Sequence, residues 1–343
     1  MNTNQTVPGE SKLSSERLAW VDVARLIAIF LVMQAHCILH CRENATMQSC
    51  AVALFFLLAG FFDTKSDCMR RLKRVAIFSI ACAFWLLVAY VFNHAELPSA
   101  EEFVSLSFWC SPGHLWFLEY LVIAILLNGV FLVLPDLARV VVIFLLVVIS
   151  TRIGVHFCVN FRAPYIPLFY SLLMYFVGVC LAMYAGKQNA VRFLFGAKPW
   201  GQNLSFVLGL CIFVTYFIIA NTKVAVPYNP LYYLCGCWAI LAMAQGCCRL
   251  FPAFSAAIAK IGPATYLVYI IHPFLLRILL KPFWYVNRHG YLSSVLKTEY
   301  EEYLYMCVCS FVGLIVIIIL SYAVYRKFLN RWHISNVLLF GKW

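Results

Sequence analysis

Residues 115–134 read LWFLEYLVIAILLNGVFLVL, and three residues later residues 138–157 read ARVVVIFLLVVISTRIGVHF. Each run has the length of about twenty residues that a helix needs to cross roughly 30 Å of hydrocarbon. Because lipid offers the peptide backbone no hydrogen-bond partners, a segment that crosses a membrane in this way folds as a helix. These two stretches therefore predict membrane-spanning helices.

The same pattern covers most of the chain. Hydrophobic residues make up 64% of the 343 residues and charged residues only 12%, whereas a soluble domain is roughly half apolar and a quarter charged. Runs of this kind lie near residues 19–40, 47–62, 72–93, 115–134, 138–157, 165–185, 203–220, 229–247, 262–282 and 303–325. Since most loops between them are short, we predict an all-α polytopic membrane protein, a bundle of about ten transmembrane helices.

The net charge of +12 is interpreted through its distribution between alternate loops. If the N-terminus is cytoplasmic, most Lys and Arg residues fall in cytoplasmic segments, while acidic residues such as Glu101 and Glu301 fall on the other side. The positive-inside rule then predicts that both termini are cytoplasmic, as an even number of helices requires. This distribution explains the basic charge without a nucleic-acid partner.

Three segments follow from these assignments. We predict a polar cytoplasmic tail over residues 1–18, a transmembrane domain over residues 19–326 and a basic cytoplasmic tail over residues 327–343. The N-terminal tail lacks the apolar core of a signal peptide, so the first helix is expected to remain as an anchor. The 15 cysteines lie mostly within helices and lack metal-ligand spacing, so no metal site is predicted.

Ionisable residues gather in the first predicted helix. Asp22 and Arg25 are three residues apart and can pair along one helical face. His36 follows Arg25 by eleven residues, which is about three turns and roughly 16 Å of rise, and so returns to nearly the same face. His40, one turn farther on, is a competing candidate. Such groups are costly in a membrane and indicate a functional site, although an orienting ion pair and a histidine bonded to a neighbouring helix would also explain them.

A second basic group, Arg70-Arg71-Leu-Lys73-Arg74, stands at the predicted cytoplasmic start of the third helix. Several guanidinium groups together can hold phosphates through paired, charge-assisted hydrogen bonds. The same cluster also fits a positive-inside signal or a contact with lipid headgroups. Combined with the first helix, it suggests a phosphate-bearing donor that enters from the cytoplasm and reacts deeper in the membrane.

Arg25-x10-His36 followed by Arg71-x-x-Arg74 resembles the paired signature of the membrane-bound acyltransferase family 3. The resemblance implies transfer of an acyl group, usually acetyl, from acyl-CoA to a hydroxyl of a surface polysaccharide or another envelope glycan. It implies acetyl-CoA as the donor substrate, no bound cofactor, and a glycan or lipid-linked saccharide as the acceptor. It also implies a multi-pass protein surrounded by the lipids of a bacterial inner membrane, where a homo-oligomer is compatible with the family.

Three further elements of the sequence are similar to the family in the same order. Residues 51–62 read AVALFFLLAGFF, residues 114–118 read HLWFL, and residues 265–272 read TYLVYIIH. They resemble the family's Phe-Phe-x-x-Ser-Gly-Tyr, His-Leu-Trp-Tyr/Phe-Leu and Ser-x-x-x-Tyr-x-x-His elements. The sequence departs from them at Ala59, where Ser is common, and at Thr265.

The resemblance implies roles for these residues. Those expected to bind the phosphates of the donor are Arg25, Arg70, Arg71, Lys73 and Arg74. His36 would take the proton of the acceptor hydroxyl as a general base, since a neutral imidazole accepts a proton near physiological pH. Transient acylation of His36 is the alternative mechanism.

A further group is expected to support the site or line the acceptor cavity: Asp22, His114, Trp116, Glu119, Tyr266, Tyr269 and His272. His114 is either functional or a cap on the fourth helix, and Trp116 also fits an aromatic belt at the membrane interface. Glu119 is either a buried partner for a cation or part of the acceptor site. The three late residues also fit simple packing in an aromatic-rich chain.

Two other functions are compatible with buried ionisable groups. A multi-pass transporter or flippase of a lipid-linked sugar or small solute would also place them along its path. However, the sequence does not show the two similar halves with matched broken helices that many secondary transporters have. A non-catalytic scaffold is disfavoured by the buried positions expected for Asp22, Arg25 and His36, so the enzyme is the preferred prediction.

Overall fold

The computed structural model describes residues 18–37, 42–64, 67–94, 99, 101, 116–160, 165–186, 189–221, 230–261, 265, 267–269, 271–272, 275 and 299–327. The regular structure in these residues is helical, without a strand, which confirms the predicted all-α class. The helices are α1 (Ala19–Cys37), α2 (Arg42–Phe62), α3 (Cys68–His94), α6 (Trp116–Val133), α7 (Asp136–Asn160), α8 (Tyr165–Tyr184), α9 (Ala190–Phe195), α10 (Pro199–Asn221), α11 (Pro230–Leu250), α12 (Pro252–Ile261) and α15 (Glu299–Lys327).

Each predicted membrane span except 262–282 has a helix at its place, and only scattered residues of that span are described. Several helices begin before the apolar run that predicted them. In α3 the reason is a cap, because Asp67 Oδ1 accepts a hydrogen bond of 3.1 Å from the backbone N–H of Met69. The short helices α9 and α12 were not predicted, since neither is long enough to span a membrane. The predicted tails lie outside the described residues, apart from their innermost positions.

The outer surface of the helices is apolar. Among the described residues, three segments are long and apolar enough to cross a membrane, namely Cys68–Phe92, Trp116–Val133 and Pro230–Leu250, and shorter apolar segments are Cys50–Phe62, Leu168–Tyr184 and Phe311–Val324. On α7 the exposed side chains include Val140, Val141, Phe144, Leu145 and Val148. A continuous apolar surface of this kind is unfavourable in water and favourable against lipid chains. The fold is therefore compatible with a multi-pass membrane protein.

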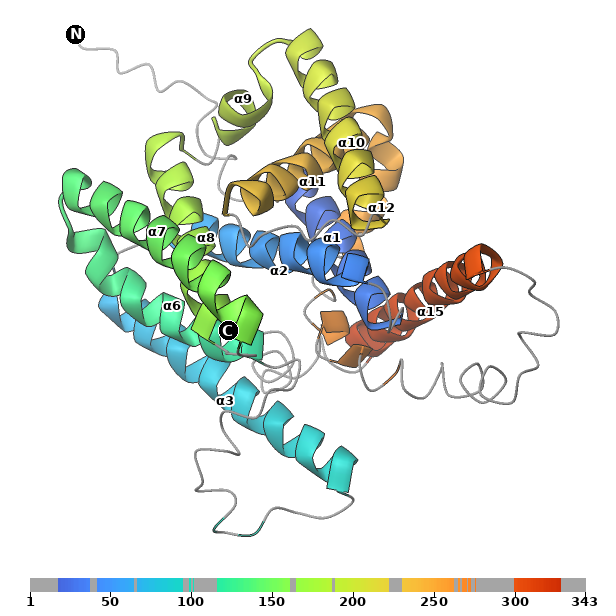
Figure 1. Cartoon of the computed structure of the whole chain (residues 1–343), viewed down its shortest axis with the longest axis horizontal. Helices are drawn as coiled ribbons and strands as arrows, with labels where there is room; N and C mark the ends of the chain where they lie inside the picture. The colour runs from blue at the N-terminus through green and yellow to red at the C-terminus, as the bar shows by residue number, and fades with distance from the viewer. Residues whose placement is uncertain are drawn as a thin grey trace, which may run out of the picture.

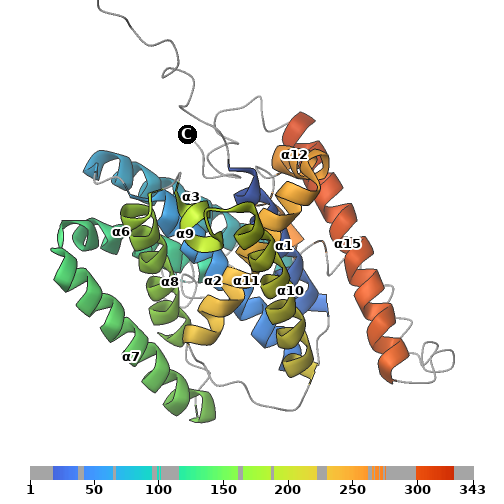
Figure 2. The same cartoon turned by 90° about the horizontal axis from the view of Figure 1, so that it is seen from above.

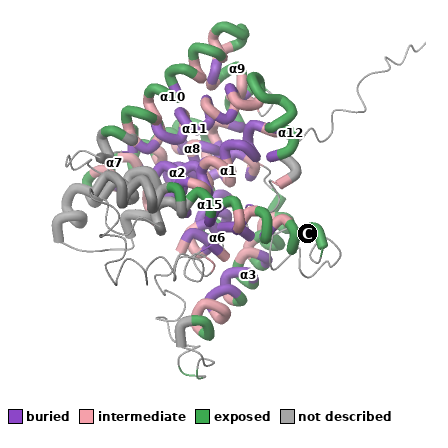
Figure 3. Tube along the Cα trace, turned by 90° about the vertical axis from the view of Figure 1, so that its right-hand side faces the viewer, coloured by how far each residue is buried: buried purple, intermediate pink, exposed green. Residues whose placement is uncertain are grey.

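Helices α1 and α2 run through the middle of the described structure, with α7 and α15 on opposite sides of them (Figures 1 and 2). The buried residues concentrate on α1, α2, α8 and α11, whereas α10 is largely exposed along one side (Figure 3). Ala24 and Ala28 of α1 and Ala51 and Ala53 of α2 have no exposed surface. Such small side chains let helix backbones approach closely, which is how helices associate when lipid is the solvent.

Helices α2 and α8 pack more extensively than any other pair of described helices. Glycines on both sides make this possible. A Cβ atom on Gly60 would overlap the carbonyl group of Tyr175, and a Cβ atom on Gly178 would overlap the carbonyl group of Leu57. The crossing holds the C-terminal end of α2 against α8, and the residues that follow Gly60 form the centre of the candidate site.

Several helix ends meet where α1 begins. The Trp20 ring lies 6.3 Å, between centroids, from the ring of Phe61 at the end of α2 and 6.3 Å from that of Phe195 at the end of α9.

Arg249 near the end of α11 donates hydrogen bonds of 3.0 Å to Pro199 O and Asn203 Oδ1 at the start of α10. The start of α10 thus lies beside the end of α11, just as the start of α1 lies beside the end of α2. Both arrangements are expected for antiparallel neighbours.

Candidate functional site

Helix α1 carries a buried acid beside a partly exposed base. Arg25 Nη1 lies 3.6 Å from Asp22 Oδ1, so the ion pair expected from their spacing is present, with the two side chains 32% and 2% exposed. The Arg25 guanidinium also lies over the ring of Phe62, with Cζ 5.7 Å from the ring centroid, a distance typical of a cation–π contact. Arg25 therefore reaches from a buried carboxylate to the C-terminal end of α2.

The basic cluster occupies the first two turns of α3. Arg70 and Lys73 are exposed on this helix. Arg70 Nε lies 3.2 Å from Asp67 Oδ2, a pair in which both side chains are about half exposed or more. Because solvent screens such a pair, it contributes little to stability. Arg70 and Lys73 thus form the exposed part of the basic group at the start of α3.

The other two arginines of the cluster contact neighbouring helices. Arg71 lies against α6, because a Cβ atom on Gly129 would be only 2.7 Å from Arg71 Nη1. Arg74 turns to the end of α2, where its Nη1 donates a hydrogen bond to Asp63 Oδ1 at 2.5 Å. The Arg71-x-x-Arg74 pair thus lies across the junction of α2, α3 and α6.

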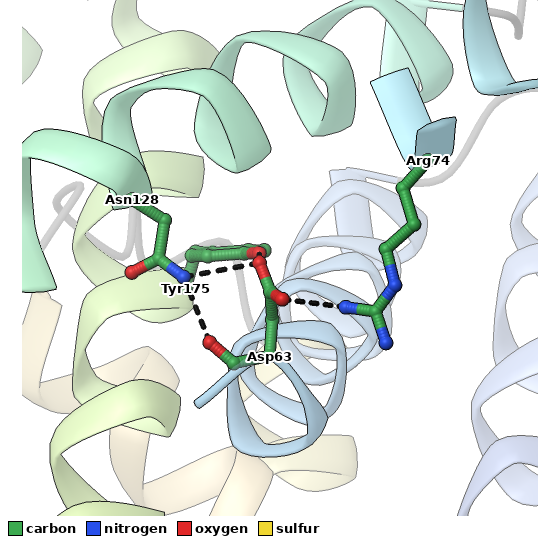
Figure 4. A network of polar contacts seen from close by, with 4 residues as sticks. All are labelled: Asp63, Arg74, Asn128 and Tyr175. Carbon is green, nitrogen blue, oxygen red and sulfur yellow. Dashed lines mark hydrogen bonds and ion pairs between the residues drawn. The ribbon is translucent and has the colours of Figure 1, made fainter. Parts of the chain in front are cut away.

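Asp63 is the centre of a buried polar network (Figure 4). Its side chain is 6% exposed. Tyr175 of α8 donates its hydroxyl to Asp63 Oδ2 at 2.6 Å. The side-chain amide of Asn128 in α6 donates to Asp63 Oδ2 at 3.0 Å and to the Asp63 backbone carbonyl at 2.8 Å. Both carboxylate oxygens and the carbonyl oxygen of this one residue are therefore hydrogen-bonded, which buried polar groups require.

Two consecutive residues, Phe62 and Asp63, connect the two parts of the sequence signature. Phe62 contacts Arg25 of α1, and Asp63 binds Arg74 of α3. We call the group formed by Arg25, Arg71 and Arg74 around this end of α2 the arginine cluster. Guanidinium groups that keep exposed surface beside buried carboxylates are suited to bind a phosphate, since each presents several N–H donors in a planar fork.

His36 lies on α1, which is helical without interruption from Ala19 to Cys37. The structure therefore places Arg25 and His36 on one continuous helix, about 16 Å apart along its axis. The side chain of His36 lies outside the described residues, as do all of His40, His114 and Tyr266. Their predicted roles stay predictions.

Two of the expected supporting residues, Tyr269 and Trp116, meet in an aromatic group. The Tyr269 ring lies 5.9 Å from that of Phe55 and 5.0 Å from that of Phe117, between centroids. The Trp116 ring stacks on that of Phe56 at 6.5 Å. These contacts join α2, the start of α6 and the late segment around residue 269. Sequence spacing alone did not show that these segments are neighbours.

His272 and Glu119 differ in their hydrogen bonding. His272 is fully buried, and its Nδ1 lies 2.5 Å from the Tyr269 carbonyl oxygen, an interaction that requires a proton on Nδ1. Glu119 Oε1 is buried without a hydrogen-bond partner. An acceptor atom that is buried in this way is costly. The expected roles of Glu119, as a partner for a cation or as part of the acceptor site, stay predictions.

Sequence reasoning missed Asp63, Asn128 and Tyr175. One signal was available, because Asn128 is an amide inside the otherwise apolar run 115–134, and buried polar residues in such runs need partners. Asp63 follows directly after the second apolar run and looks like an ordinary interfacial acid. Only the packing of α2 against α6 and α8 brings the three together.

Comparison with known proteins identifies the family of the chain. The model of a family described as an acyltransferase domain, in acyltransferase family 3, matches residues 18–326. No curated protein and no solved structure matches the chain. In the part of the chain that the structure describes, no group of three or more His, Cys, Asp or Glu side chains could hold a metal ion.

Proposed function

This chain belongs to acyltransferase family 3, and from this premise we propose that it is a membrane O-acetyltransferase. The donor is cytoplasmic acetyl-CoA, and the acceptor is a hydroxyl group of a cell-surface or envelope glycan. The observation that carries the proposal is the arginine cluster at the end of α2, which includes Arg25 on the same continuous helix as His36.

The arginine cluster suits one end of acetyl-CoA. This donor has phosphate groups at its nucleotide end and a reactive thioester at the other, and a pantetheine arm joins them. Arg25, Arg71 and Arg74 would bind the phosphates by charge-assisted hydrogen bonds. Because about 16 Å of helix separates Arg25 from His36, the pantetheine arm would carry the thioester along α1 to the histidine.

His36 would then act on the acceptor. As a general base it takes the proton of the glycan hydroxyl while that oxygen attacks the thioester carbonyl carbon. A carbon–oxygen bond forms, the carbon–sulfur bond breaks, and the CoA sulfur leaves as a thiolate that takes up a proton. The alternative is a two-step transfer through acetylated His36. A burst of CoA release without acceptor would favour the second route.

Orientation in the membrane follows from the same chemistry. Since acetyl-CoA is cytoplasmic, the arginine cluster faces the cytoplasm, and the end of α1 that bears His36 lies deeper in the membrane. We propose a bundle of ten transmembrane helices in a bacterial inner membrane, with residues 262–282 as the ninth and both termini cytoplasmic. The positive-inside distribution of Lys and Arg supports this orientation.

Turnover of acetyl-CoA tests the proposal. Wild-type protein in detergent, supplied with cell-envelope glycans, is expected to release CoA and acetylate glycan. His36→Ala should lower kcat by about a hundredfold or more, the usual contribution of a general base. Arg71→Ala should mainly raise the KM for acetyl-CoA. Arg192→Ala, which removes an exposed arginine of α9 outside the arginine cluster, is the matched control and should behave like wild type.

The outcomes separate the parts of the proposal. Unchanged turnover in His36→Ala would contradict the role of the histidine, and an unchanged KM in Arg71→Ala would contradict the donor site. A wild-type protein that neither binds nor consumes acetyl-CoA with any extracted glycan would contradict the enzyme itself.

A further inference from the structure

Asp63 lies outside the sequence signature, yet it binds one of the signature's arginines. We infer that Asp63 is a positioning residue for the donor: it holds the Arg74 guanidinium in the orientation that binds a phosphate of acetyl-CoA. The inference rests on the proposed function and extends it to a residue that the chemistry of acetyl transfer does not itself require.

The first step is that Asp63 is fixed by donors from two helices. Tyr175 of α8 donates to Oδ2, the amide of Asn128 in α6 bridges Oδ2 and the backbone carbonyl, and Arg74 lies on the opposite side of Asp63 (Figure 4). With these donors in place, Oδ2 is satisfied and the carboxylate cannot rotate without breaking hydrogen bonds. Oδ1 is therefore presented to Arg74 in one defined position.

The second step concerns the exposure of Arg74. Its side chain is 47% exposed, and the contact with Asp63 uses Nη1. A guanidinium has five N–H donors in a planar fork, so this single contact leaves a large part of the fork directed away from Asp63. The carboxylate of Asp63 is only 6% exposed, so the guanidinium is held from its buried side. Asp63 therefore sets the direction in which the rest of the fork points.

The third step predicts what the loss of this contact does. Asp63→Asn keeps nearly the shape of the side chain but removes its charge and leaves a single acceptor oxygen, because an amide nitrogen only donates. That oxygen cannot accept both the hydrogen bond from Arg74 and those that now reach Oδ2. Arg74 would then lose its fixed direction, and the donor phosphate would be bound more weakly. His36 is far along α1, so the acetyl-transfer step should remain.

Two donors distinguish positioning from a general structural defect. Acetyl-pantetheine carries the thioester and the arm of acetyl-CoA but none of its phosphates. In Asp63→Asn the KM for acetyl-CoA should rise about tenfold or more, as expected when a charge-assisted hydrogen bond is lost, with kcat retained. The kcat/KM for acetyl-pantetheine should stay near the wild-type value. A fall by the same factor for both donors would overturn the inference.

The matched control is Asp67→Asn. It removes one carboxylate from the same α2–α3 connection, keeps a residue type that caps helices well and affects only the exposed contact with Arg70. Its effect on the KM for acetyl-CoA should be less than about twofold, since exposed pairs are weak. A rise as large as that of Asp63→Asn would show a general effect of charge and overturn the inference.

A double-mutant cycle tests whether Asp63 acts through Arg74. Once Arg74→Gln has removed the guanidinium, the added change Asp63→Asn should not raise the KM for acetyl-CoA further, because coupled residues are not additive. A multiplicative effect of the two substitutions would contradict the inference. If the wild-type protein does not turn over acetyl-CoA, the proposed function fails and this inference fails with it. If the wild type is active but Asp63→Asn is impaired equally with both donors, only this inference fails.

Tyr175→Phe provides a second route if Asp63→Asn does not accumulate as folded protein. It removes one hydrogen bond to Asp63 Oδ2 and keeps the contact with Arg74. A rise in the KM for acetyl-CoA that is smaller than that of Asp63→Asn, with no change for acetyl-pantetheine, supports the inference. An equal change for both donors overturns it.

Discussion

Arg25, Arg71 and Arg74 are the same residue type in the sequence, but the structure places them in three different environments. Arg25 lies between a buried acid and an aromatic ring, Arg71 lies against a glycine, and Arg74 is bound to Asp63. Because each guanidinium is oriented by a different contact, substitutions of the neighbouring residues should affect donor binding one arginine at a time.

Gly129→Ala changes the environment of Arg71 alone. The added methyl group would lie 2.7 Å from Arg71 Nη1, closer than van der Waals contact allows. The far end of the flexible arginine side chain can shift, so the protein should fold normally, while the KM for acetyl-CoA should rise about fivefold through the loss of roughly 1 kcal/mol of phosphate binding. Steady-state kinetics with acetyl-CoA measures this effect.

Gly201→Ala is the control for that substitution. A Cβ atom there has its nearest neighbour, Phe195 O, at 3.6 Å, which is an ordinary contact. Alanine is also favoured over glycine inside a helix such as α10. The KM and the stability of Gly201→Ala should therefore match the wild type or improve slightly. An unchanged KM in Gly129→Ala would contradict the placement of Arg71 against α6.

Helix α2 connects the parts of the site. Its aromatic residues contact the start of α6 and Tyr269, and its glycine allows the close approach of α8. Its last residue, Phe62, contacts Arg25, and Asp63 directly after it binds Arg74. In the element AVALFFLLAGFF, which resembles an element of the family, Gly60 is thus explained by the close packing of α2 against α8. The helix sets both the distance between neighbouring helices and the position of Asp63.

Gly60→Ala and Gly178→Ala should each destabilise the protein. A Cβ atom at either site would overlap backbone of the other helix, and backbone cannot move aside as a flexible side chain can. Overpacking of this kind costs about 1–3 kcal/mol. Thermal unfolding in detergent, followed by circular dichroism, should show a lowered midpoint for both variants beside Gly201→Ala. Equal midpoints in all three would contradict the close crossing of α2 and α8.

The molecule taken together has an apolar outer surface and a polar interior junction. Large hydrophobic side chains are exposed on α7, α10 and α15, whereas Asp22, Asp63, Asn128 and His272 are buried. A soluble protein exposes mostly polar side chains, whereas this surface exposes apolar ones. Such a surface is expected where lipid surrounds the helices. Where the arginine cluster lies relative to the two faces of the membrane then decides which donor can reach it.

Reporter fusions test the proposed orientation. A fluorescent protein fused after residue 343 should be fluorescent and alkaline phosphatase fused there inactive, because we expect this end in the cytoplasm. The reverse is expected for fusions within residues 95–115, between the end of α3 and the start of α6. An active phosphatase after residue 343 would contradict both the orientation and a cytoplasmic arginine cluster.

Much of this organisation was determined by the sequence alone. A run of about twenty apolar residues dictates a helix wherever lipid is the solvent, so the predicted spans coincide with described helices except for 262–282. The Asp22–Arg25 pair and the placement of Arg25 and His36 on one helix are equally local, because helical geometry relates residues a few turns apart.

The contacts between helices were decided only by the tertiary structure. Asp63 binds Asn128 and Tyr175, which lie 65 and 112 residues farther along the chain, and apolar helices of similar length offer no pattern that selects such neighbours. Their choice depends on the small residues, such as Gly60 and Gly178, that let particular backbones approach. The orientation of Arg74 is therefore a property of how α2, α6 and α8 pack, and not of the Arg71-x-x-Arg74 motif that contains it.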